Sequence, residues 1–396
     1  MNDSTRRTFL KGASGLAAGA AYPWAAQARQ NEAATAADRP GKKSSFTVGQ
    51  RSGRWWLITP EGEPFFSIGL NHIDSASLRY TENIHIWREK YGGSMERWLK
   101  ESVRPDLQSW GFNTVGWVQE VVTRTPSNHR HSRNFTFEEY QWLGLPYCHM
   151  LPFADFHQWE VETRHPDLFS DDFEQWCDYV ARAGCAQFAE DPKLIGYFYL
   201  DCPTWVHERP DNRWKGPLFD PEKLATTAGR EELSALARRY YKVTHEAIRR
   251  YDKNHLILGD RYEGRARLPE EVVKAACPYV DVLSFQHFSP PEQIDDDFAR
   301  WHELTGKPIL LADAARHVSV ADGYRAHNVQ WYKEVMDTLR DLEACVGFHL
   351  CGAYIRNRVR RCGLRDEANR ELQSAREISK INREVTQWMR TLSTGR

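Results

Sequence analysis

The sequence predicts a single (β/α)8 barrel (TIM barrel, α/β class), because short apolar runs alternate along it with amphipathic helical stretches. Continuous apolar runs are typical of parallel strands buried on both faces, and such strands need crossover connections that are usually helical. Eight such units in roughly 350 residues fit a closed barrel better than an open sheet. The sequence contains neither the GxGxxG nor the GxxxxGK[ST] pattern of the usual nucleotide-binding folds.

The expected strands are, in order, FFSIGL (65–70), NTVGW (113–117), CHMLPF (148–153), LIGYFYL (194–200), HLILG (255–259), VDVLSF (280–285), PILLA (308–312) and VGFHL (346–350). A helical period lies between several of these runs. One predicted helix places on a single face Phe173, Trp176, Cys177, Val180, Ala181 and Phe188. A second does the same with Leu233, Leu236, Tyr240, Val243 and Ala247.

The N-terminus resembles a twin-arginine export signal over residues 1–28. Arg6 and Arg7 precede a weakly apolar Gly/Ala stretch that ends in AQA, and we expect cleavage after Ala28. Residues 29–44 have no periodicity and are expected to be a linker, which leaves residues 45–396 as the catalytic barrel. No later stretch approaches the roughly 20 apolar residues of a membrane span. We therefore expect a periplasmic or secreted protein with no membrane partner.

The composition favours a neutral or locally recognised partner. Lys and Arg number 53 against 54 Asp and Glu, so the net charge of -1 offers no electrostatic case for nucleic acid. The 15 Trp and 16 Tyr residues suit stacking on sugar rings, although large cores also use aromatic residues. The eight cysteines form no CxxC pair of the zinc type, and buried free thiols are expected for most of them. None of these features indicates an oligomeric state.

Polar side chains follow every expected strand, whereas the strands themselves are nearly free of charge. In a barrel of this kind the active site lies at the C-terminal ends of the strands. A single polar residue there is more often a cap or a loop hydrogen-bonder, but eight in register favour a polar cleft. In strand order, the candidates are Asn71 and His72, Trp117, His157, Asp201 and Trp205, Arg261, His287, Asp313 and His317, and Tyr354.

Two of these candidates suggest acid–base chemistry by carboxylates. Cleavage of a glycosidic bond needs one group to protonate the leaving oxygen and another to act as nucleophile or base. Asp201 and Asp313 end strands four and seven, across the barrel, and are the best pair. The sequence contains no GxSxG motif, the nucleophile elbow of serine hydrolases.

A metal site is the second chemistry that the candidates allow. The residues that could converge on an ion are His72, His157, His287, His317, Asp201 and Cys202. The sequence has no HExxH, and its one HxH, His129 with His131, stands in a polar stretch away from any expected strand end. We therefore expect neither a metal nor another cofactor.

The chain resembles the clan A (β/α)8 glycoside hydrolases, and within them the β-agarase-like proteins, over most of residues 46–365. The likeness is carried by ITPEGEPFFSIGLNHID, WGFNTVGW, KLIGYFYLDCPTW, NHLILGDRY, YVDVLSFQHF and GKPILLADAA, in that order. In that clan the fourth strand ends in Asn-Glu, whose Glu is the acid/base, and the seventh ends in a Glu nucleophile. The resemblance places Asp201 on the Asn, Cys202 on the first Glu and Asp313 on the second, so both family glutamates are replaced.

The resemblance implies a glycoside hydrolase acting on a galactan-type poly- or oligosaccharide, agar- or carrageenan-like. Asp201 could serve as general acid with Asp313 as second carboxylate. Asp side chains are shorter than Glu, so the distance between the two carboxyl groups would increase from the roughly 5 to 5.5 Å of a retaining pair toward the roughly 6.5 to 9.5 Å of an inverting pair. Alternatively, the protein is a catalytically silent carbohydrate-binding barrel, since a Cys is a poor general acid. A third alternative takes the acid from Glu120, Asp260 or Glu263.

Further roles follow from position. Trp117, Trp205 and Tyr354 are expected as sugar platforms. Arg261, which matches an arginine of agarase-like proteins, is expected to hold a substrate hydroxyl or to orient Asp201. Hydrogen bonds to hydroxyls are expected from Asn71, His72, His157, His287 and His317. The basic run RNRVRRCGLR (356–365) is either a solvated face or a site for sulfate or carboxylate groups of a polysaccharide.

Overall fold

The computed structural model describes residues 45–125, 128–154, 166–206 and 221–394. All of them belong to one compact unit, Lys42–Arg396. The expected signal (1–28), nearly all of the expected linker (29–44) and the candidate His157 lie outside the described residues.

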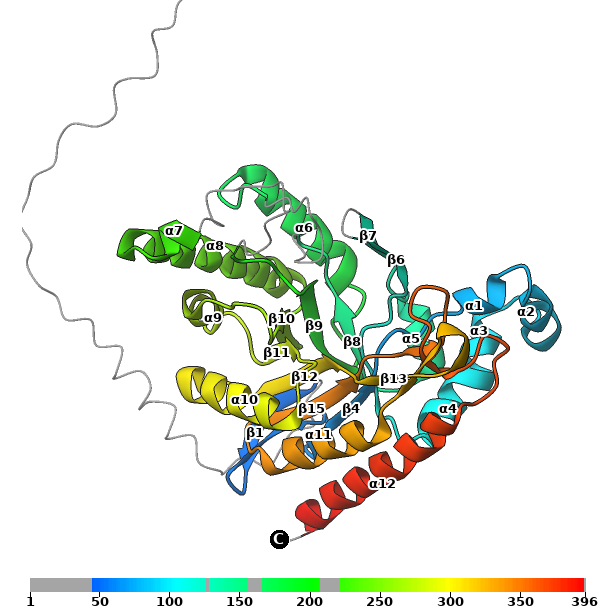
Figure 1. Cartoon of the computed structure of the whole chain (residues 1–396). Coiled ribbons are helices and arrows are strands. Elements are labelled where there is room, and N and C mark those ends of the chain that lie inside the picture. Colours follow the sequence, from blue (N-terminus) through cyan, green and yellow to red (C-terminus); the bar gives the residue numbers. More distant parts are fainter. Residues whose placement is uncertain (1–44, 126–127, 155–165, 207–220, 395–396) are drawn as a thin grey trace, which may run out of the picture. The chain divides into compact units, whose positions relative to one another are not determined.

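Eight parallel strands close into a barrel, which confirms the predicted fold class (Figure 1). Their order around the barrel follows the chain, and β15 pairs with β4 to close the ring. Each strand overlaps one of the predicted apolar runs. The strands are β4 (Ser67–Leu70), β5 (Thr114–Val115), β8 (Tyr147–Met150), β9 (Leu194–Asp201), β10 (Leu256–Glu263), β11 (Leu283–Gln286), β12 (Ile309–Ala314) and β15 (Cys345–Leu350).

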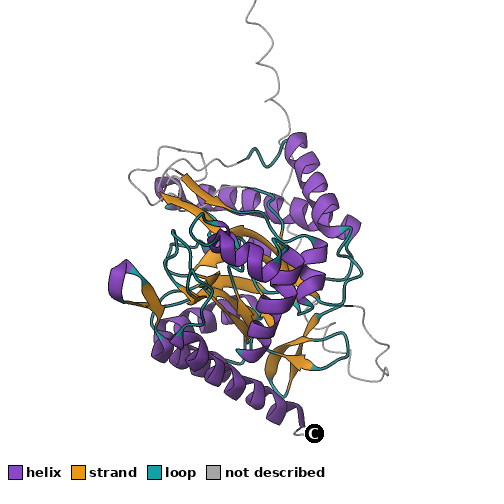
Figure 2. Cartoon of the chain, turned by 90° about the vertical axis from the view of Figure 1, so that its right-hand side faces the viewer, coloured by secondary structure: helices purple, strands orange, loops and turns teal. Residues whose placement is uncertain are grey.

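Helices surround the strands (Figure 2). The longer ones are α2 (Ile84–Tyr91), α4 (Arg104–Ser109), α5 (Phe137–Leu143), α6 (Asp171–Cys185), α8 (Thr227–Tyr251), α9 (Glu270–Ala276), α10 (Pro291–Thr305), α11 (Val329–Asp341) and α12 (Gln373–Thr394). Short helices are α1 (Ala76–Arg79), α3 (Met95–Trp98) and α7 (Pro221–Leu224), and a π-helical turn spans Leu99–Val103. Among the described residues, no helix is long and apolar enough to cross a membrane.

The predicted helix faces are correct with two exceptions, Trp176 and Phe188; Phe188 is buried but lies beyond the end of α6. On α8 the expected stripe is buried, with Leu236 partly so. On α6 the residues Phe173, Cys177, Val180 and Ala181 are buried, but Trp176 is 47% exposed. Trp176 lies at the edge of the stripe, where its indole Nε1 donates to the Phe153 carbonyl at 2.9 Å. The eight cysteines are free, and all but Cys277 are buried, as the sequence predicted.

Small sheets lie at both ends of the barrel. At the N-terminal end, β1 (Thr47–Arg51), β2 (Arg54–Ile58) and β3 (Pro64–Phe65) form an antiparallel sheet. Phe46 and Leu57 from this region join Ile195, Leu258 and Val346 of the barrel strands in one apolar cluster, so the sheet closes that end. The other small pairs follow barrel strands: β6 (Val121–Thr125) with β7 (Asn128–His131), β13 (His317–Ser319) with β14 (Arg325–His327), and β16 (Ala353–Ile355) with β17 (Gly363–Arg365). These three strand pairs and their connections form part of the wall of the cavity described below.

Candidate active site

A cavity of about 190 Å³ lies at the C-terminal ends of the barrel strands. Its walls come from β9, β11, β12 and the pairs that follow β5, β12 and β15. It is lined by Val121, His131, Asp201, Arg265, Gln286, Phe288, Asp313, Ala315, His317, Arg325, Cys351, Arg360 and Cys362. Of the residues expected at the site, the structure brings together here Asp201, Asp313 and His317.

Asp201 is held by a buried arginine on the neighbouring strand. Asp201 ends β9 and is in register with Arg261 of β10, whose Nη2 donates to Asp201 Oδ1 at 2.7 Å. Arg261 is 0% exposed, and its Nη1 donates to the carbonyl of Ala312 at 3.3 Å. Burial opposes the charge of Arg261, but the carboxyls of Asp201 and Asp313 outweigh it, so its pKa is raised. Of the two roles expected for Arg261, this geometry matches the orientation of Asp201.

Asp313 is held by Asn71. The Asn71 side-chain amide donates to Asp313 Oδ1 at 2.6 Å and to the Ala312 carbonyl at 2.9 Å. Its oxygen accepts from the backbone N–H of Trp117 at 2.7 Å. A Cβ at Gly116 would lie 2.1 Å from that oxygen, so this close approach requires glycine. Asn71 is buried and fully engaged, which makes it a positioning residue and not a direct sugar contact. Burial raises the pKa of Asp313, and the charges of Arg261 and Arg360 offset this only in part.

Two of the histidines expected to bind hydroxyls lie behind the cavity. The Nδ1 of His72 is 2.5 Å from the Gln119 carbonyl, and its Nε2 contacts the guanidinium of Arg360. Burial and that guanidinium hold the pKa of His72 well below its ordinary value. The Nε2 of His287 lies 2.8 Å from Asp297, on α10. His72 is engaged by the protein at both ring nitrogens and His287 at Nε2, and neither residue lines the cavity where a sugar hydroxyl would be contacted.

The three expected aromatic platforms are core residues. The ring of Trp205 stacks on Tyr241 of α8 at 6.1 Å and is almost fully buried. The buried ring of Tyr354 packs against Trp98 and Trp110, and its hydroxyl contacts Ser102 at 3.0 Å.

Trp117 is covered in the same way, since the guanidinium carbon of Arg261 lies 4.0 Å from its ring centroid. A platform needs an exposed ring face, whereas these rings are used for packing inside the protein.

Cys202, which the resemblance aligns with the family acid, is fully buried and does not line the cavity. Its backbone has a φ of 47°, and its N–H donates to the Arg261 carbonyl at 3.0 Å. Burial, reinforced by the Asp201 charge, holds the pKa of its thiol well above the ordinary value. The side chain is therefore no proton donor at the cavity.

The three alternative acids also lie outside the cavity lining. Asp260 accepts from the hydroxyls of Tyr240 and Tyr241 on α8. Glu263 pairs with Arg265 at 2.9 Å. Glu120 accepts from Asn357 at 3.0 Å; burial and the neighbouring Asp74 raise its pKa to about 8.

Several residues of the cavity wall were not expected at the site. His131 was expected away from any strand end, and this was wrong: β7 turns back against β6 and brings the ring to the cavity. Arg325 arrives on β14, through a hairpin whose Asp322 and Gly323 have φ of 60° and 67°. An Asp-Gly pair is a strong hairpin signal and could have revealed this element.

The basic run 356–365 is mostly ion-paired or bonded to backbone. Arg356 pairs with Glu367 at 2.6 Å, Arg358 with Glu82 at 2.8 Å and Arg365 with Asp106 at 2.6 Å. Arg361 donates to the Asp322 carbonyl. Of the five arginines in this run, Arg360 alone lines the cavity.

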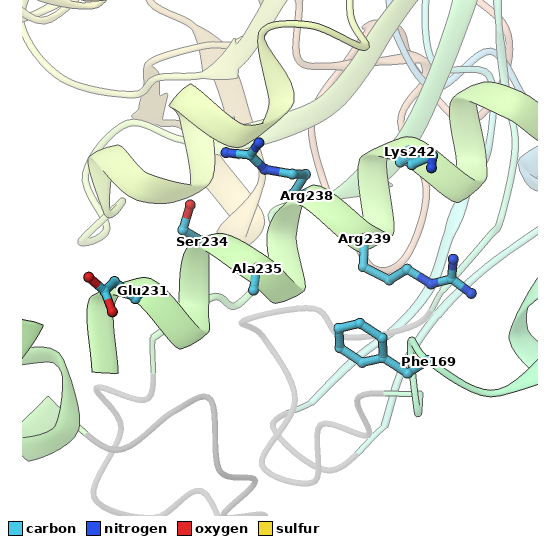
Figure 3. Close-up of a pocket in the computed structure, with 7 residues that line it drawn as sticks. All are labelled: Phe169, Glu231, Ser234, Ala235, Arg238, Arg239 and Lys242. Carbon is cyan, nitrogen blue, oxygen red and sulfur yellow. The ribbon is translucent and has the colours of Figure 1, made fainter. Parts of the chain in front are cut away.

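A second hollow, of about 450 Å³, lies on the outer side of α8. It is lined by Phe169, Glu231, Ser234, Ala235, Arg238, Arg239 and Lys242 (Figure 3). Phe169 is 60% exposed and faces Arg239, whose guanidinium carbon lies 5.8 Å from the ring centroid. This hollow is formed by successive turns of α8 together with Phe169, which precedes α6, and the predicted catalytic residues do not line it.

Comparison with known proteins finds likeness at the level of the fold. No family model matches the sequence, and no curated protein matches it. The crystal structure of an agarase, AgWH50C, is similar with a TM-score of 0.67 at 18% identity, over 90% of this chain and 65% of that one. An exo-β-agarase is similar with a TM-score of 0.69 at 18% identity, over 90% of this chain and 66% of that one. A GH2 β-galacturonidase from Eisenbergiella tayi bound to galacturonate is similar with a TM-score of 0.53 at 13% identity, over 86% of this chain and 54% of that one. The chain thus spans less than two thirds of the length of these structures.

Proposed function

We propose that the chain is a glycoside hydrolase that cleaves a galactan-type poly- or oligosaccharide with Asp201 and Asp313 as its carboxylate pair. The observation that carries this proposal is that both carboxyls line one cavity at the C-terminal end of the barrel. The fold shared with two agarases supports the substrate class. The test is incubation with defined agar and carrageenan oligosaccharides and identification of the products by mass spectrometry. Intact substrates throughout the panel would contradict the proposal.

The surroundings of the two carboxyls support different roles for them. Asp201 is ion-paired with the buried Arg261 at 2.7 Å, and an ion-paired carboxylate suits a base. Burial raises the pKa of Asp313, which suits a proton donor. We therefore assign Asp313 as the acid and Asp201 as the base, the reverse of the expectation from the sequence.

Inversion at the anomeric carbon follows from the short side chains. Asp313 stands where the resemblance places a Glu, and Asp201 stands one position before the other; each Asp side chain is one methylene shorter than Glu, which would leave room for a water molecule between carboxylate and sugar. NMR of freshly formed product should then show the anomer opposite to that of the substrate. Retained configuration would require one Asp to attack the sugar directly.

The arginines of the cavity favour an anionic sugar. Arg325 and Arg360 line it, and the partners that the described residues offer their guanidinium groups are uncharged: the Arg360 carbonyl for Arg325, and His72 and Cys351 for Arg360. Guanidinium groups bind sulfate and carboxylate groups through paired hydrogen bonds. The β-galacturonidase of similar fold, bound to galacturonate, is consistent with an acidic sugar in such a barrel. We therefore favour sulfated or uronate-bearing galactans over neutral agarose.

A second candidate function is a carbohydrate-binding barrel without catalysis. It is favoured by Cys202, which is buried outside the cavity at the position that the resemblance aligns with the family acid. Calorimetric binding of an oligosaccharide that the wild-type protein never cleaves would establish this alternative.

We also propose that the protein is exported through its twin-arginine segment. Replacing Arg6 and Arg7 together by Lys should retain the full-length precursor in the cytoplasmic fraction, whereas Arg29→Lys, beyond the expected cleavage point, should not. Unchanged export of the double variant would contradict the proposal.

A further inference from the structure

We propose that His317, His327 and Cys362 form a binding site for a transition-metal ion, with zinc as the best match. One ring nitrogen from each histidine and the Cys362 sulfur all lie within 4.8 Å of one another. The His327 Nε2 and the Cys362 Sγ are 3.5 Å apart. Tetrahedral zinc with bonds of about 2.0 to 2.1 Å to nitrogen and about 2.3 Å to sulfur places these atoms about 3.6 Å apart. Two of the ligands therefore already stand at coordination spacing.

The local fold brings the three ligands together. His317 and His327 are register partners across the β13–β14 hairpin, with ring centroids 5.1 Å apart. Cys362 directly precedes β17, and this segment is tied to the hairpin beside it. The N–H of Arg325 donates to the Arg361 carbonyl at 3.0 Å, and its guanidinium donates to the Arg360 carbonyl at 2.7 Å. The ligand-bearing segments are thus fixed to each other without an ion.

The ring of His327 is buried, and its Nε2 lies 3.5 Å from the Cys362 sulfur. The residue is 4% exposed, and its Nδ1 has no hydrogen-bond partner within the described part of the chain. A Cβ at Gly352 would lie 2.4 Å from the ring, so the ring occupies a space that only glycine leaves open. An ion shared with His317 and Cys362 would bind the imidazole at Nε2, the ring nitrogen that lies 3.5 Å from Cys362 Sγ, and would leave the proton on Nδ1. Burial also holds the pKa of His327 well below its ordinary value, which leaves the ring neutral with a lone pair for a metal.

The thiol would bind the ion as a thiolate. Burial raises the pKa of Cys362 to about 12, against the opposing charges of Arg360, Arg325 and Arg356. When the ion binds, the S–H bond breaks, the proton leaves to solvent, and the sulfur electron pair forms the metal–sulfur bond. The arginine charges favour the thiolate but repel a dication, so the affinity should be below that of a Cys-rich zinc site.

A neighbouring group, His72, Asp313 and Cys351, also has ligand atoms within 4.8 Å of one another. It is the weaker candidate because the guanidinium of Arg360 already contacts His72 Nε2 and lies 3.2 Å from Cys351 Sγ. A fixed cation stands where the ion would have to lie. The sequence led us to expect no metal, and the proposed site at His317, His327 and Cys362 departs from that expectation.

The position of the cluster connects the ion to the cavity. His317 and Cys362 line the cavity that also contains Asp201 and Asp313. Three protein ligands leave one position of a tetrahedral ion open, and we infer that this position faces the cavity. The site does not depend on the proposed glycosidase activity, because binding is measured without substrate.

The test uses the full chain, freed of metal and kept reduced, titrated with Co²⁺. We expect about one equivalent to bind, with thiolate-to-cobalt charge-transfer absorption that Zn²⁺ abolishes by displacement. Cys362→Ser should remove this absorption, whereas Cys351→Ser, at another buried thiol of the same cavity, should keep it. His317→Gln, on a partly exposed ring, should weaken binding at least ~10-fold, since even outer-shell partners contribute about 10- to 100-fold.

Three results would overturn the proposal: a wild-type protein without charge-transfer absorption, an absorption that survives in both Cys362→Ser and His317→Gln, or one that disappears in Cys351→Ser only. Circular dichroism checks that each variant is folded. If Cys362→Ser does not fold, the wild-type spectrum and the loss of affinity in His317→Gln decide the outcome.

Discussion

Arg261 donates a 2.7 Å hydrogen bond to Asp201 from a position without solvent exposure, and its other terminal nitrogen reaches the carbonyl of the residue before Asp313. One buried guanidinium thus joins the strands that carry both carboxyls. The geometry of the candidate active site depends on this contact.

Removing this cation should destabilise the protein strongly. Arg261→Met leaves Asp201 as a buried charge without its partner, which costs about 3 to 5 kcal/mol in comparable pairs. The free energy of unfolding in urea measures the loss. The matched control is Arg370→Met, because Arg370 pairs with Asp366 at 2.7 Å but its side chain is 79% exposed, so about 0 to 1 kcal/mol is expected. Equal losses in the two variants would show that the Arg261 pair has no special weight.

The Asp74–Glu120 pair should make stability fall as pH rises. Burial and the Asp74 charge raise the pKa of Glu120 from its ordinary 4.5 to about 8. Between these two values the folded protein holds a proton that the unfolded chain releases, so the free energy of unfolding decreases with increasing pH. The stabilisation is fully present below about 4.5 and is lost as the pH passes through about 8.

Glu120→Gln should flatten this part of the pH profile of urea unfolding, since a glutamine does not titrate. Glu303→Gln, at an exposed glutamate of α10, should leave the wild-type profile unchanged. A Glu120→Gln profile as steep as that of the wild type would mean that other groups cause the slope.

Arg360 should discriminate between charged and neutral oligosaccharides. Loss of a charged hydrogen bond costs about 1.5 to 3 kcal/mol, so Arg360→Met should raise KM for a sulfated substrate about 10- to 100-fold. A desulfated analogue should be affected much less. Arg358→Met is the control from the same segment, because its side chain is 66% exposed and pairs with Glu82. An equal rise in KM for both substrates would remove the argument for an anionic sugar.

The barrel could be predicted from the sequence because strands buried on both faces leave continuous apolar runs, as in 194–200 and 308–312. Asp201 and Asp313 could be placed at the site because the ends of barrel strands converge. The orienting role expected for Arg261 has a simple basis, since adjacent strands set Asp201 beside it in register.

The composition of the cavity wall could not be predicted with the same success. Trp205 and Tyr354 follow strands, yet the ring of Trp205 packs against Tyr241 of α8 and the ring of Tyr354 packs against Trp98. The proximity of His327 to Cys362 depends on two separate excursions of the chain after β12 and β15. No periodic pattern in the sequence predicts the contact between His327 and Cys362.

The most direct test of the account is the rate of oligosaccharide cleavage by Asp201→Asn and Asp313→Asn, with Asp172→Asn on the exposed first turn of α6 as control. General acid–base groups contribute about 10²- to 10⁴-fold, so each active-site variant should lose activity by that order while still binding the substrate in calorimetry. The control should retain wild-type activity. Active-site variants that cleave at the wild-type rate, or a folded wild-type protein that binds the oligosaccharide without cleaving it, would contradict the assignment of these two carboxylates.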